Sequence, residues 1–272
     1  MPMSIHPTAV VSKNAELAKD VEVGPFAVIE GAVVLRSGVT VGSHAVIKGP
    51  TVVGEGTRVF HHAVIGEDPQ DLKYNGEATR LEIGKRNTFR EFSTAHRGTA
   101  AGKGGGVTRI GDDNLFMAYS HVAHDCVVGN GCVFANCAAL AGHVVIQDAA
   151  ILGGLSGVHQ HSRVGRMAMV GGGAMCTQDV PPFTIAQGDR ARLFGLNIVG
   201  LRRHGVSADT ISALRDAYRD LFSQGLPMRI ALEQVRAAYA RVPEVQELVE
   251  FIENSARGVC RSVGTEIGAQ DT

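Results

Sequence analysis

The chain has 272 residues and a formal net charge of −1, which argues against bulk electrostatic attraction to nucleic acid or to an anionic membrane. Its five cysteines are odd in number and form no C-x-x-C pair, so we expect reduced thiols rather than a disulfide framework or a zinc knot. The first ten residues lack a basic and an apolar region, and no apolar run approaches the ~18–20 residues of a membrane span. We therefore expect a cytoplasmic protein with no signal peptide and no membrane span.

The N-terminal part of the chain repeats with a period of six. Eleven successive sixth positions carry an aliphatic residue, namely Ile5, Val11, Leu17, Val23, Ile29, Leu35, Val41, Ile47, Val53, Val59 and Ile65. The register breaks at 66–82 and again near 96–109, and it returns from Ile110 to Val170. A period of six fits neither an α-helix nor an ordinary half-buried strand, and it is typical of a parallel β-helix.

In such a fold three hexads make one coil of roughly 18 residues, and successive coils stack about 4.8 Å apart, the spacing of paired strands. The aliphatic residue of each hexad points into the prism. A glycine often follows it, as at Gly24, Gly54 and Gly111. We expect these glycines to serve corners that need unusual φ/ψ angles.

The repeat ends at 179–183, DVPPF, because two prolines cannot continue sheet pairing. We expect a loop over 184–206 and a helix over 207–222, where the apolar spacing is helical and Ser207 can cap the N-terminus. Further helices are expected near 228–241 and 244–257.

These patterns together predict a mainly β protein with a C-terminal α-helical part. The predicted domains are a β-helix domain over 1–190 with loop insertions near 66–82 and 96–109, a helical domain over 191–262, and a flexible tail over 263–272.

Stacked coils bring residues 18 apart onto one face. His124 therefore lies under Gly142 and Gln160, and His143 and His159 belong to the same face in the next two coils. Histidine is the usual general base near neutral pH. A cluster of three histidines on one face is thus a candidate catalytic site.

Two neighbours strengthen this hypothesis. Asp125 follows His124 directly, and a carboxylate beside a histidine can hold its tautomer and stabilise the imidazolium that forms. Gly142 could let a backbone N–H approach a reacting oxygen, as an oxyanion donor must. A plain corner glycine is the alternative interpretation.

Loops and termini offer weaker candidates. Asp71 and Lys73 lie in the first insertion, and loops on a rigid scaffold often carry functional residues, although a solvated surface loop is an equal alternative. Arg202 and Arg203 could clamp a phosphate, but a solvated pair is the simpler interpretation. KGGG, at 103–106, lacks the spacing of a phosphate-binding loop and reads as a connector.

Several motifs in this order carry a specific resemblance. They are DPQDLKYNGEATRLEIG, TAHRGT, SHVAHDCVVGNGC, LAGHV, GVHQ, QDVPPFTIAQG and FGLNIVGLRR. From about Ile5 to Arg261 the chain resembles the UDP-N-acetylglucosamine O-acyltransferases, a family of hexapeptide-repeat enzymes of lipid A and lipopolysaccharide biosynthesis.

The resemblance implies a left-handed parallel β-helix and a homotrimer. It also implies transfer of an R-3-hydroxyacyl chain from acyl carrier protein to the 3-hydroxyl of UDP-N-acetylglucosamine, the first step of lipid A biosynthesis, without a cofactor or a metal. By that likeness His124 takes the proton of the sugar hydroxyl, which attacks the thioester directly. Asp125 orients His124, and the N–H of Gly142 stabilises the oxyanion.

The remaining roles are also implied by the resemblance. The residues that match substrate-binding positions are Asp71, Lys73, His121, His143, His159, Gln160, Asn197 and Arg203. Gly172 matches the position that measures acyl length, and glycine there implies a long chain. By charge complementarity we add four candidate contacts for the acidic carrier protein, Arg163, Arg166, Arg190 and Arg192.

Other functions remain open at this stage. The same transfer could use a 3-amino UDP-sugar, since Val199 and His204 stand where the family's residues differ. A later N-acyltransferase of the pathway has an extra N-terminal domain, for which hexads starting at Ile5 leave no room. A metal-dependent hydrase could use His121 and His124, with a third histidine across a subunit boundary. A purely structural β-helix would show no turnover.

Overall fold

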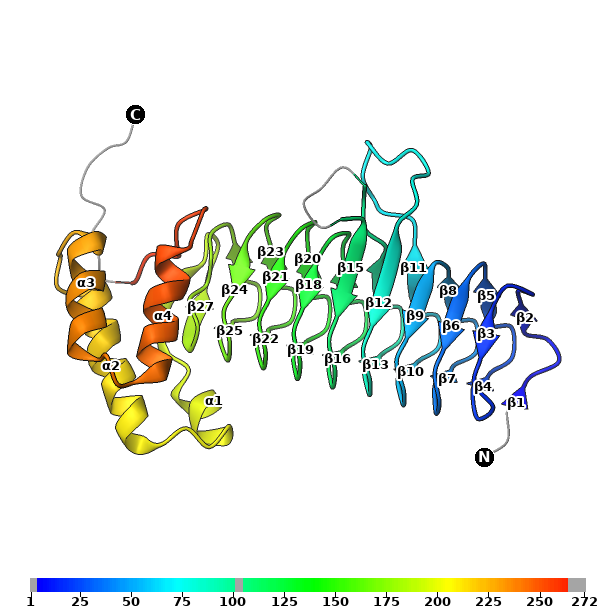
Figure 1. Ribbon diagram of the computed structural model, residues 1–272, viewed down its shortest axis with the longest axis horizontal. Helices are drawn as coiled ribbons and strands as arrows, with labels where there is room; N and C mark the ends of the chain where they lie inside the picture. Colours follow the sequence, from blue (N-terminus) through cyan, green and yellow to red (C-terminus); the bar gives the residue numbers. More distant parts are fainter. Residues whose placement is uncertain (1–3, 101–104, 264–272) are drawn as a thin grey trace.

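The computed structural model describes residues 4–100 and 105–263. These residues form a long three-sided β-solenoid followed by a small group of helices, with the N-terminus at one end of the solenoid and the helices at the other (Figure 1). The segment between β11 and β12 projects from one edge of the solenoid near its middle (Figure 1). The predicted mainly β solenoid with C-terminal helices is therefore confirmed.

Within the described residues the strands form three sheets, one for each side of the prism. Sheet A has eleven strands: β1 (Ser4–Ile5), β4 (Glu22–Val23), β7 (Thr40–Val41), β10 (Arg58–Val59), β13 (Thr88–Phe89), β16 (Leu115–Phe116), β19 (Val133–Phe134), β22 (Ile151–Leu152), β25 (Met169–Val170), β27 (Thr184–Gln187) and β28 (Arg192–Leu196). Sheet B has nine: β2 (Val10–Val11), β5 (Val28–Glu30), β8 (Val46–Lys48), β11 (Val64–Glu67), β14 (Thr94–His96), β17 (His121–Val122), β20 (Ala139–Leu140), β23 (Gly157–Val158) and β26 (Met175–Cys176). Sheet C has eight: β3 (Glu16–Leu17), β6 (Val33–Leu35), β9 (Thr51–Val53), β12 (Arg80–Ile83), β15 (Val107–Ile110), β18 (Val127–Val128), β21 (Val145–Ile146) and β24 (Arg163–Val164).

The pairing is parallel and keeps the 18-residue register wherever the hexads are unbroken, as where Val133 pairs with Ile151. The register changes at the two insertions. Val64 of β11 pairs with Thr94, which in turn pairs with His121, steps of 30 and 27 residues. Both extra segments leave sheet B and return to sheet C, so they project from the same edge of the prism.

Four helices follow the solenoid, α1 (Ile198–Arg203), α2 (Ala208–Phe222), α3 (Met228–Ala238) and α4 (Pro243–Glu253). The helix predicted to start at Ser207 is confirmed, since its hydroxyl accepts a hydrogen bond from the Thr210 N–H at 3.1 Å. The two later helices exist but are shorter than predicted. None of the helices in the described part of the chain combines the length and apolar character needed to cross a bilayer.

The prediction of a loop over 184–206 was wrong. This segment contains the antiparallel pair β27–β28 and the short helix α1, none of which follows the hexad pattern. The division into domains over 1–190 and 191–262 stays a prediction, and the tail predicted over 263–272 lies outside the described residues apart from Val263.

The interior of the prism contains two residues from each hexad. Beyond the first coil the aliphatic residue is buried, and so is a residue two positions before it, usually a small one, as with Cys126 before Val128. The middle coils widen this core with a column of rings: Phe116 stacks on Phe89 at 4.6 Å between ring centroids and on Phe134 at 4.7 Å. Within the described residues the prism is therefore filled by side chains.

Each corner has two special positions, one that lacks space for a side chain and one that adopts a left-handed φ angle. We expected the glycine after each aliphatic residue to adopt an unusual φ angle. This prediction was wrong at Gly54 and Gly111, where φ lies outside the left-handed region. These positions need space: a Cβ on Gly54 would lie 2.3 Å from the carbonyl oxygen of Gly84 in the next coil. The left-handed φ falls three residues before the aliphatic position instead, usually on a residue with a side chain, such as Asp125 with φ of 58°.

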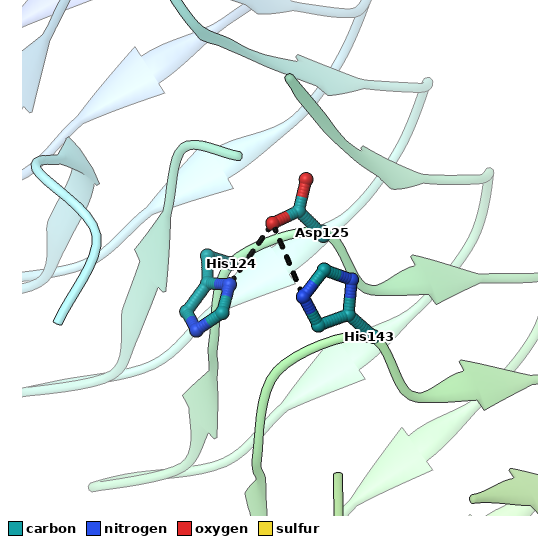
Figure 2. A group of neighbouring side chains, drawn as sticks. All are labelled: His124, Asp125 and His143. Atoms are coloured by element: carbon teal, nitrogen blue, oxygen red, sulfur yellow. Dashed lines mark hydrogen bonds and ion pairs between the residues drawn. The ribbon is translucent and has the colours of Figure 1, made fainter. Parts of the chain in front are cut away.

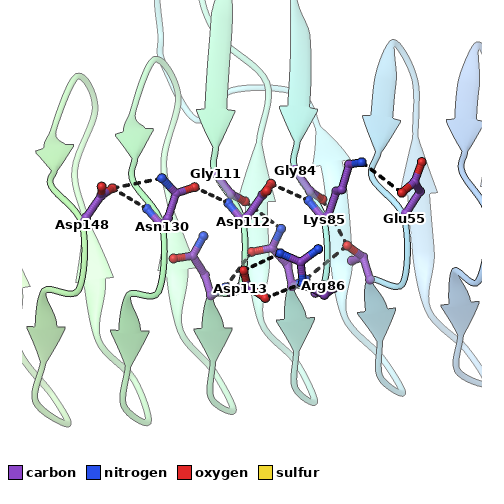
Figure 3. Close-up of polar contacts among 12 residues, drawn as sticks. Glu55, Gly84, Lys85, Arg86, Gly111, Asp112, Asp113, Asn130 and Asp148 are labelled. Carbon is purple, nitrogen blue, oxygen red and sulfur yellow. Dashed lines mark hydrogen bonds and ion pairs between the residues drawn. The ribbon is translucent and has the colours of Figure 1, made fainter. Parts of the chain in front are cut away.

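A ladder of side chains ties the coils together along the outside of one corner (Figure 3). The Oδ1 of Asp148 accepts from the Asn130 N–H, and the Oδ1 of Asn130 accepts from the Asp112 N–H, both at 2.7 Å. The Oδ1 of Asp112 accepts from the Lys85 N–H at 2.8 Å. Each side chain thus satisfies a corner N–H that the parallel strands leave unpaired.

Phe116 provides a test of the filled interior. Phe116→Ala leaves a ring-sized cavity between Phe89 and Phe134, so we expect the free energy of unfolding to fall by about 3–5 kcal/mol in urea denaturation. Val127→Ala, on the exposed outer side of β18, should stay within about 0.5 kcal/mol of the wild type. Equal losses in the two variants would contradict this account of the core.

Candidate active site

His124 and Asp125 lie at the corner between β17 of sheet B and β18 of sheet C. The left-handed φ of 58° at Asp125 turns the chain sharply, so that two consecutive side chains meet rather than point to opposite sides. The Nδ1 of His124 lies 2.9 Å from the Oδ2 of Asp125 (Figure 2). The imidazole then presents its Nε2 as the nitrogen free for chemistry.

Asp125 is held by more than its histidine. Its Oδ2 also accepts from the N–H of Thr99 at 2.9 Å and from the Thr99 hydroxyl at 2.7 Å, and its own N–H donates to Thr108 Oγ1. Burial works to raise the pKa of Asp125, but the hydrogen bonds from His124 and Thr99 outweigh it and lower that pKa below its ordinary value. The carboxylate therefore stays ionised beside the imidazole.

His143 stacks above Asp125 in the next coil, and His161 lies one coil further. The Nε2 of His143 is 3.8 Å from the Oδ2 of Asp125, the same oxygen that His124 contacts, and the two imidazole rings meet edge to face at 5.2 Å between centroids (Figure 2). Burial is the main cause that lowers the pKa of His143, opposed by the charges of Asp125 and Asp71. His143 is therefore neutral at pH 7 and can accept as well as donate.

A groove of about 620 Å³ runs along the outer face of sheet B beside this corner. Its floor is built from small residues, because Ala139 and Gly157 occupy the outward positions of β20 and β23. Met175 lies at the far end, where its sulfur would be 2.9 Å from a Cβ on Gly157. Five of the predicted site residues line the groove: His121, His124, Gly142, His159 and Gln160.

Gly142 fits its predicted place. A Cβ there would lie 2.4 Å from Cε1 of His124, so glycine is required for the imidazole to occupy this position. Among the described residues, no group accepts a hydrogen bond from the Gly142 N–H. A backbone donor thus lies next to the free edge of His124, the arrangement an oxyanion needs.

The first insertion brings Gln70 to the groove. Asp71 is next to it, with its Oδ1 accepting from the Lys73 N–H at 2.9 Å, and its charge acts on His143. The Lys73 side chain is exposed. The structure therefore brings Asp71 near the histidines and leaves Lys73 at the surface of the loop.

Three predicted residues lie away from this groove within the single chain. Gly172 follows β25, at the corner between sheets A and B, nearly three coils beyond His124. Asn197 is buried as the N-cap of α1, where it accepts from Gly200 N–H and donates to the Met167 carbonyl. Arg203 is exposed at the end of α1.

The three groups His124, Asp125 and His143 have ligand atoms within 4.8 Å of one another, close enough for one metal ion to reach. However, the Oδ2 of Asp125 already accepts from His124 and twice from Thr99. A metal at Oδ2 would have to displace these donors. The arrangement fits a hydrogen-bonded catalytic dyad better than a metal centre.

Comparisons with known proteins agree with this geometry. A family model described as UDP-N-acetylglucosamine O-acyltransferase, domain 2, matches residues 179–260, and a bacterial transferase hexapeptide model matches 108–142. Acyl-(acyl-carrier-protein)–UDP-N-acetylglucosamine O-acyltransferases from Paraburkholderia phymatum and Alkalilimnicola ehrlichii are 51% and 57% identical, over 94% of this chain and 99% of each relative. The structure of the Francisella novicida UDP-N-acetylglucosamine acyltransferase is similar with a TM-score of 0.92 at 36% identity, over 96% of this chain and 95% of that one.

The chain belongs to the UDP-N-acetylglucosamine O-acyltransferase family. Membership confirms the left-handed β-helix expected from the resemblance.

Two of the arginines suggested as carrier-protein contacts have other partners in this member of the family. Arg163 is paired with Asp179 at 2.9 Å and donates to the Phe251 carbonyl of α4. Arg166 is paired with Glu247 of α4 at 2.6 Å. Both therefore fasten the helices to the last coils, and their contact with carrier protein stays a prediction.

Sequence reasoning missed the residues that hold the dyad in this family member. Thr99 belongs to HRGT, directly before a segment interpreted as a connector, and Arg97 precedes it by two residues. Arg97 is almost fully buried, which is rare for an arginine. An HRGT quartet between a strand and a glycine-rich run was the available signal.

His121 makes the site sensitive to acid. Burial, and then the rings of His96 and His124, lower the pKa of His121 to about 4, whereas a histidine in the unfolded chain has a pKa of about 6.5. Between these values the unfolded chain binds a proton that folded His121 does not, so the free energy of unfolding falls as the pH falls from 6.5 to 4. We expect the decrease in the free energy of unfolding between pH 6.5 and pH 4 to be smaller in His121→Gln than in the wild type, by at most about 3 kcal/mol. Urea denaturation at a series of pH values measures this difference. An unchanged pH slope in the variant would show that His121 is not buried in its neutral form.

Proposed function

We propose that this protein transfers a 3-hydroxyacyl chain from acyl carrier protein to the 3-hydroxyl of UDP-N-acetylglucosamine, the first step of lipid A biosynthesis. The observation that carries the proposal is the His124–Asp125 dyad beside a groove, with the free N–H of Gly142 next to it. The relatives named for this reaction support the choice of substrates. The protein would act in the cytoplasm, where carrier protein and nucleotide sugar meet.

In the proposed reaction the sugar 3-hydroxyl attacks the thioester carbonyl carbon while Nε2 of His124 takes its proton. Asp125 keeps the proton on Nδ1 and stabilises the imidazolium that forms. The Gly142 N–H donates to the oxyanion of the tetrahedral intermediate. When the C–S bond breaks, His124 returns the proton to the departing thiol, so the dyad ends as it began.

The rest of the groove would position the two substrates. The small floor residues Ala139 and Gly157 leave room for a hydrocarbon chain along sheet B. His121, neutral because burial lowers its pKa to about 4, would hydrogen-bond the sugar together with Asp71, His143 and Gln160. Lys73 and His159 would lie near the thioester end of the donor.

A homotrimer would complete the site. Gly172, Asn197 and Arg203 match substrate positions but lie away from the groove in their own chain, at a different corner or in α1. A neighbouring copy would supply them to the groove, with Arg203 at the nucleotide phosphates. Asn197, whose amide caps α1, would act there chiefly by fixing the helix that carries Arg203.

The test follows the acylated nucleotide sugar after mixing purified protein with 3-hydroxymyristoyl carrier protein and UDP-N-acetylglucosamine. We expect product with the wild type, and a rate about 10²–10⁴-fold lower with His124→Ala, the range of a lost general base. His44→Ala, in an N-terminal coil, should retain the wild-type rate. No wild-type product with this sugar, with its 3-amino analogue or with other acyl lengths would disprove the proposal.

Gly172 provides a test of the acyl specificity. A Cβ there would meet only the Gly154 carbonyl oxygen at 3.4 Å, and its φ lies outside the left-handed region, so a side chain can be added without strain. We expect Gly172→His to lower kcat/KM for a 3-hydroxymyristoyl donor relative to a 3-hydroxydecanoyl donor by about tenfold or more, since each lost methylene contact costs about fourfold. Competition between the two donors measures this ratio, and an unchanged ratio would remove Gly172 from the acyl site.

A further inference from the structure

One short segment contacts His121, the first insertion and the dyad. His96–Thr99 leaves β14 and begins the second insertion. His96 packs edge to face against His121, at 5.0 Å between ring centroids. Arg97 bonds the base of the first insertion, and Thr99 bonds the catalytic carboxylate. The segment therefore joins the substrate loop to the dyad through three covalently linked positions.

Arg97 holds the first insertion. Its guanidinium, only 6% exposed, donates to Asp68 Oδ1 and to the Gly49 carbonyl, and lies 3.3 Å from the Tyr74 hydroxyl. Asp68 and Tyr74 flank the stretch that carries Gln70 and Asp71. A buried guanidinium is stable only with such partners, because an unpaired one would pay a large desolvation cost. Arg97 and Asp68 thus fix where this loop crosses the groove.

Lys48 supports the same loop from the coil below. Its Nζ lies 2.7 Å from Oε1 of Glu67 and 3.6 Å from Oδ2 of Asp68. These pairs are partly exposed and contribute less than the buried Arg97 contact. The principal attachment of the loop is therefore Arg97.

Thr99 holds the other end. It donates twice to Oδ2 of Asp125, through its N–H at 2.9 Å and its hydroxyl at 2.7 Å. Among the described residues nothing donates to the buried Oδ1 of Asp125, so the carboxylate is fixed entirely through Oδ2. Two donors from one residue prevent the carboxylate from rotating away from His124.

Gly98 fixes the position of Arg97 relative to Thr99. A Cβ on Gly98 would lie 2.4 Å from backbone atoms of Gly106 and Val107, so the chain at this point is pressed against the start of β15. Its N–H also donates to the Arg80 carbonyl at 3.4 Å. The peptide between Arg97 and Thr99 is thus immobilised from both sides.

We propose that Arg97 and Thr99 are positioning residues for acyl transfer, Arg97 by holding the Gln70–Asp71 loop over the groove and Thr99 by fixing the Asp125 carboxylate against His124. This rests on the proposed function. The two arms predict different kinetic defects, because the loop contacts the sugar and the dyad moves the proton.

Arg97→Met tests the first arm. Loss of the guanidinium frees the loop, so KM for UDP-N-acetylglucosamine should rise about 10–100-fold, the usual cost of misplaced binding groups, while kcat falls much less. Arg86→Met is the matched control, because it removes an arginine paired with Asp113 on the outside of the solenoid (Figure 3) and should keep the wild-type KM.

Limited trypsin digestion tests the same arm without any substrate. Lys73 is exposed within the loop, and mass spectrometry identifies the cut that follows it. We expect Arg97→Met to be cleaved after Lys73 at least several-fold faster than wild type, and Arg86→Met at the wild-type rate. This readout stays valid if the wild type proves inactive on the sugar, so failure of the proposed function is separable from failure of this inference.

Thr99→Val tests the second arm. It removes the hydroxyl donor and keeps both the shape and the N–H, so kcat should fall about tenfold or more with little change in KM. Thr99→Ser restores the donor and should recover most of kcat. Thr57→Val, which removes a buried hydroxyl bonded between other coils, should lower stability and leave kcat unchanged.

The outcomes decide between positioning and mere packing. A KM rise with faster cleavage in Arg97→Met, and a kcat loss rescued by Thr99→Ser, support the proposal. Unchanged KM and cleavage in Arg97→Met would overturn the first arm. Equal kcat losses in Thr99→Val and Thr99→Ser, or a Thr57→Val defect as large as that of Thr99→Val, would overturn the second.

Discussion

Stacking at one strand spacing governs every part of this molecule. Each residue of the regular solenoid lies about 4.8 Å from the residue 18 positions earlier, so its side chain must fit what the neighbouring coils place there. Where that space is occupied by backbone, only glycine fits, as at Gly54. Where a corner N–H has no strand partner, a side chain from the next coil supplies an acceptor, as Asn130 does for Asp112. The same rule places Gly142 against His124 and makes a side chain impossible there.

Part of the site follows from the stacking of residues 18 apart, and part of it does not. Regular stacking alone gives the column of His143 above Asp125 and the small floor of the groove. It cannot give Asp125 two more hydrogen-bond donors or bring Gln70 over the groove, because adjacent coils offer only residues 18 apart. Two insertions at one edge, separated by a single coil, supply both. The breaks in the repeat are therefore the places where the scaffold gains functional residues that its period excludes.

The period explains what could be predicted and what could not. The solenoid, the columns and the position of Gly142 above His124 follow from counting sixes, and the His124–Asp125 pair follows from adjacency in the sequence. The φ of the corner glycines was assigned wrongly because the sequence shows only that glycine recurs, whereas the structure distinguishes lack of space at Gly54 from the left-handed turn at Asp125. Arg163 bonds Asp179, 16 residues away, and Thr99 bonds Asp125, 26 residues away. Neither separation equals the 18-residue interval between stacked positions, so the hexad pattern does not reveal these pairs.

A narrow prism also limits where a reaction can occur. Its interior is filled by the column of Phe89, Phe116 and Phe134, so substrates must bind on the outside. An outer face is open to water, which weakens hydrogen bonds and would compete with the proposed sugar acceptor for the thioester. The first insertion brings Gln70 to the groove, and Arg203 lies at the end of a helix that follows the solenoid. A second copy packed along this face would close the open side of the groove and bring its Arg203 to the nucleotide phosphates. Catalysis on this scaffold would therefore require assembly of the copies.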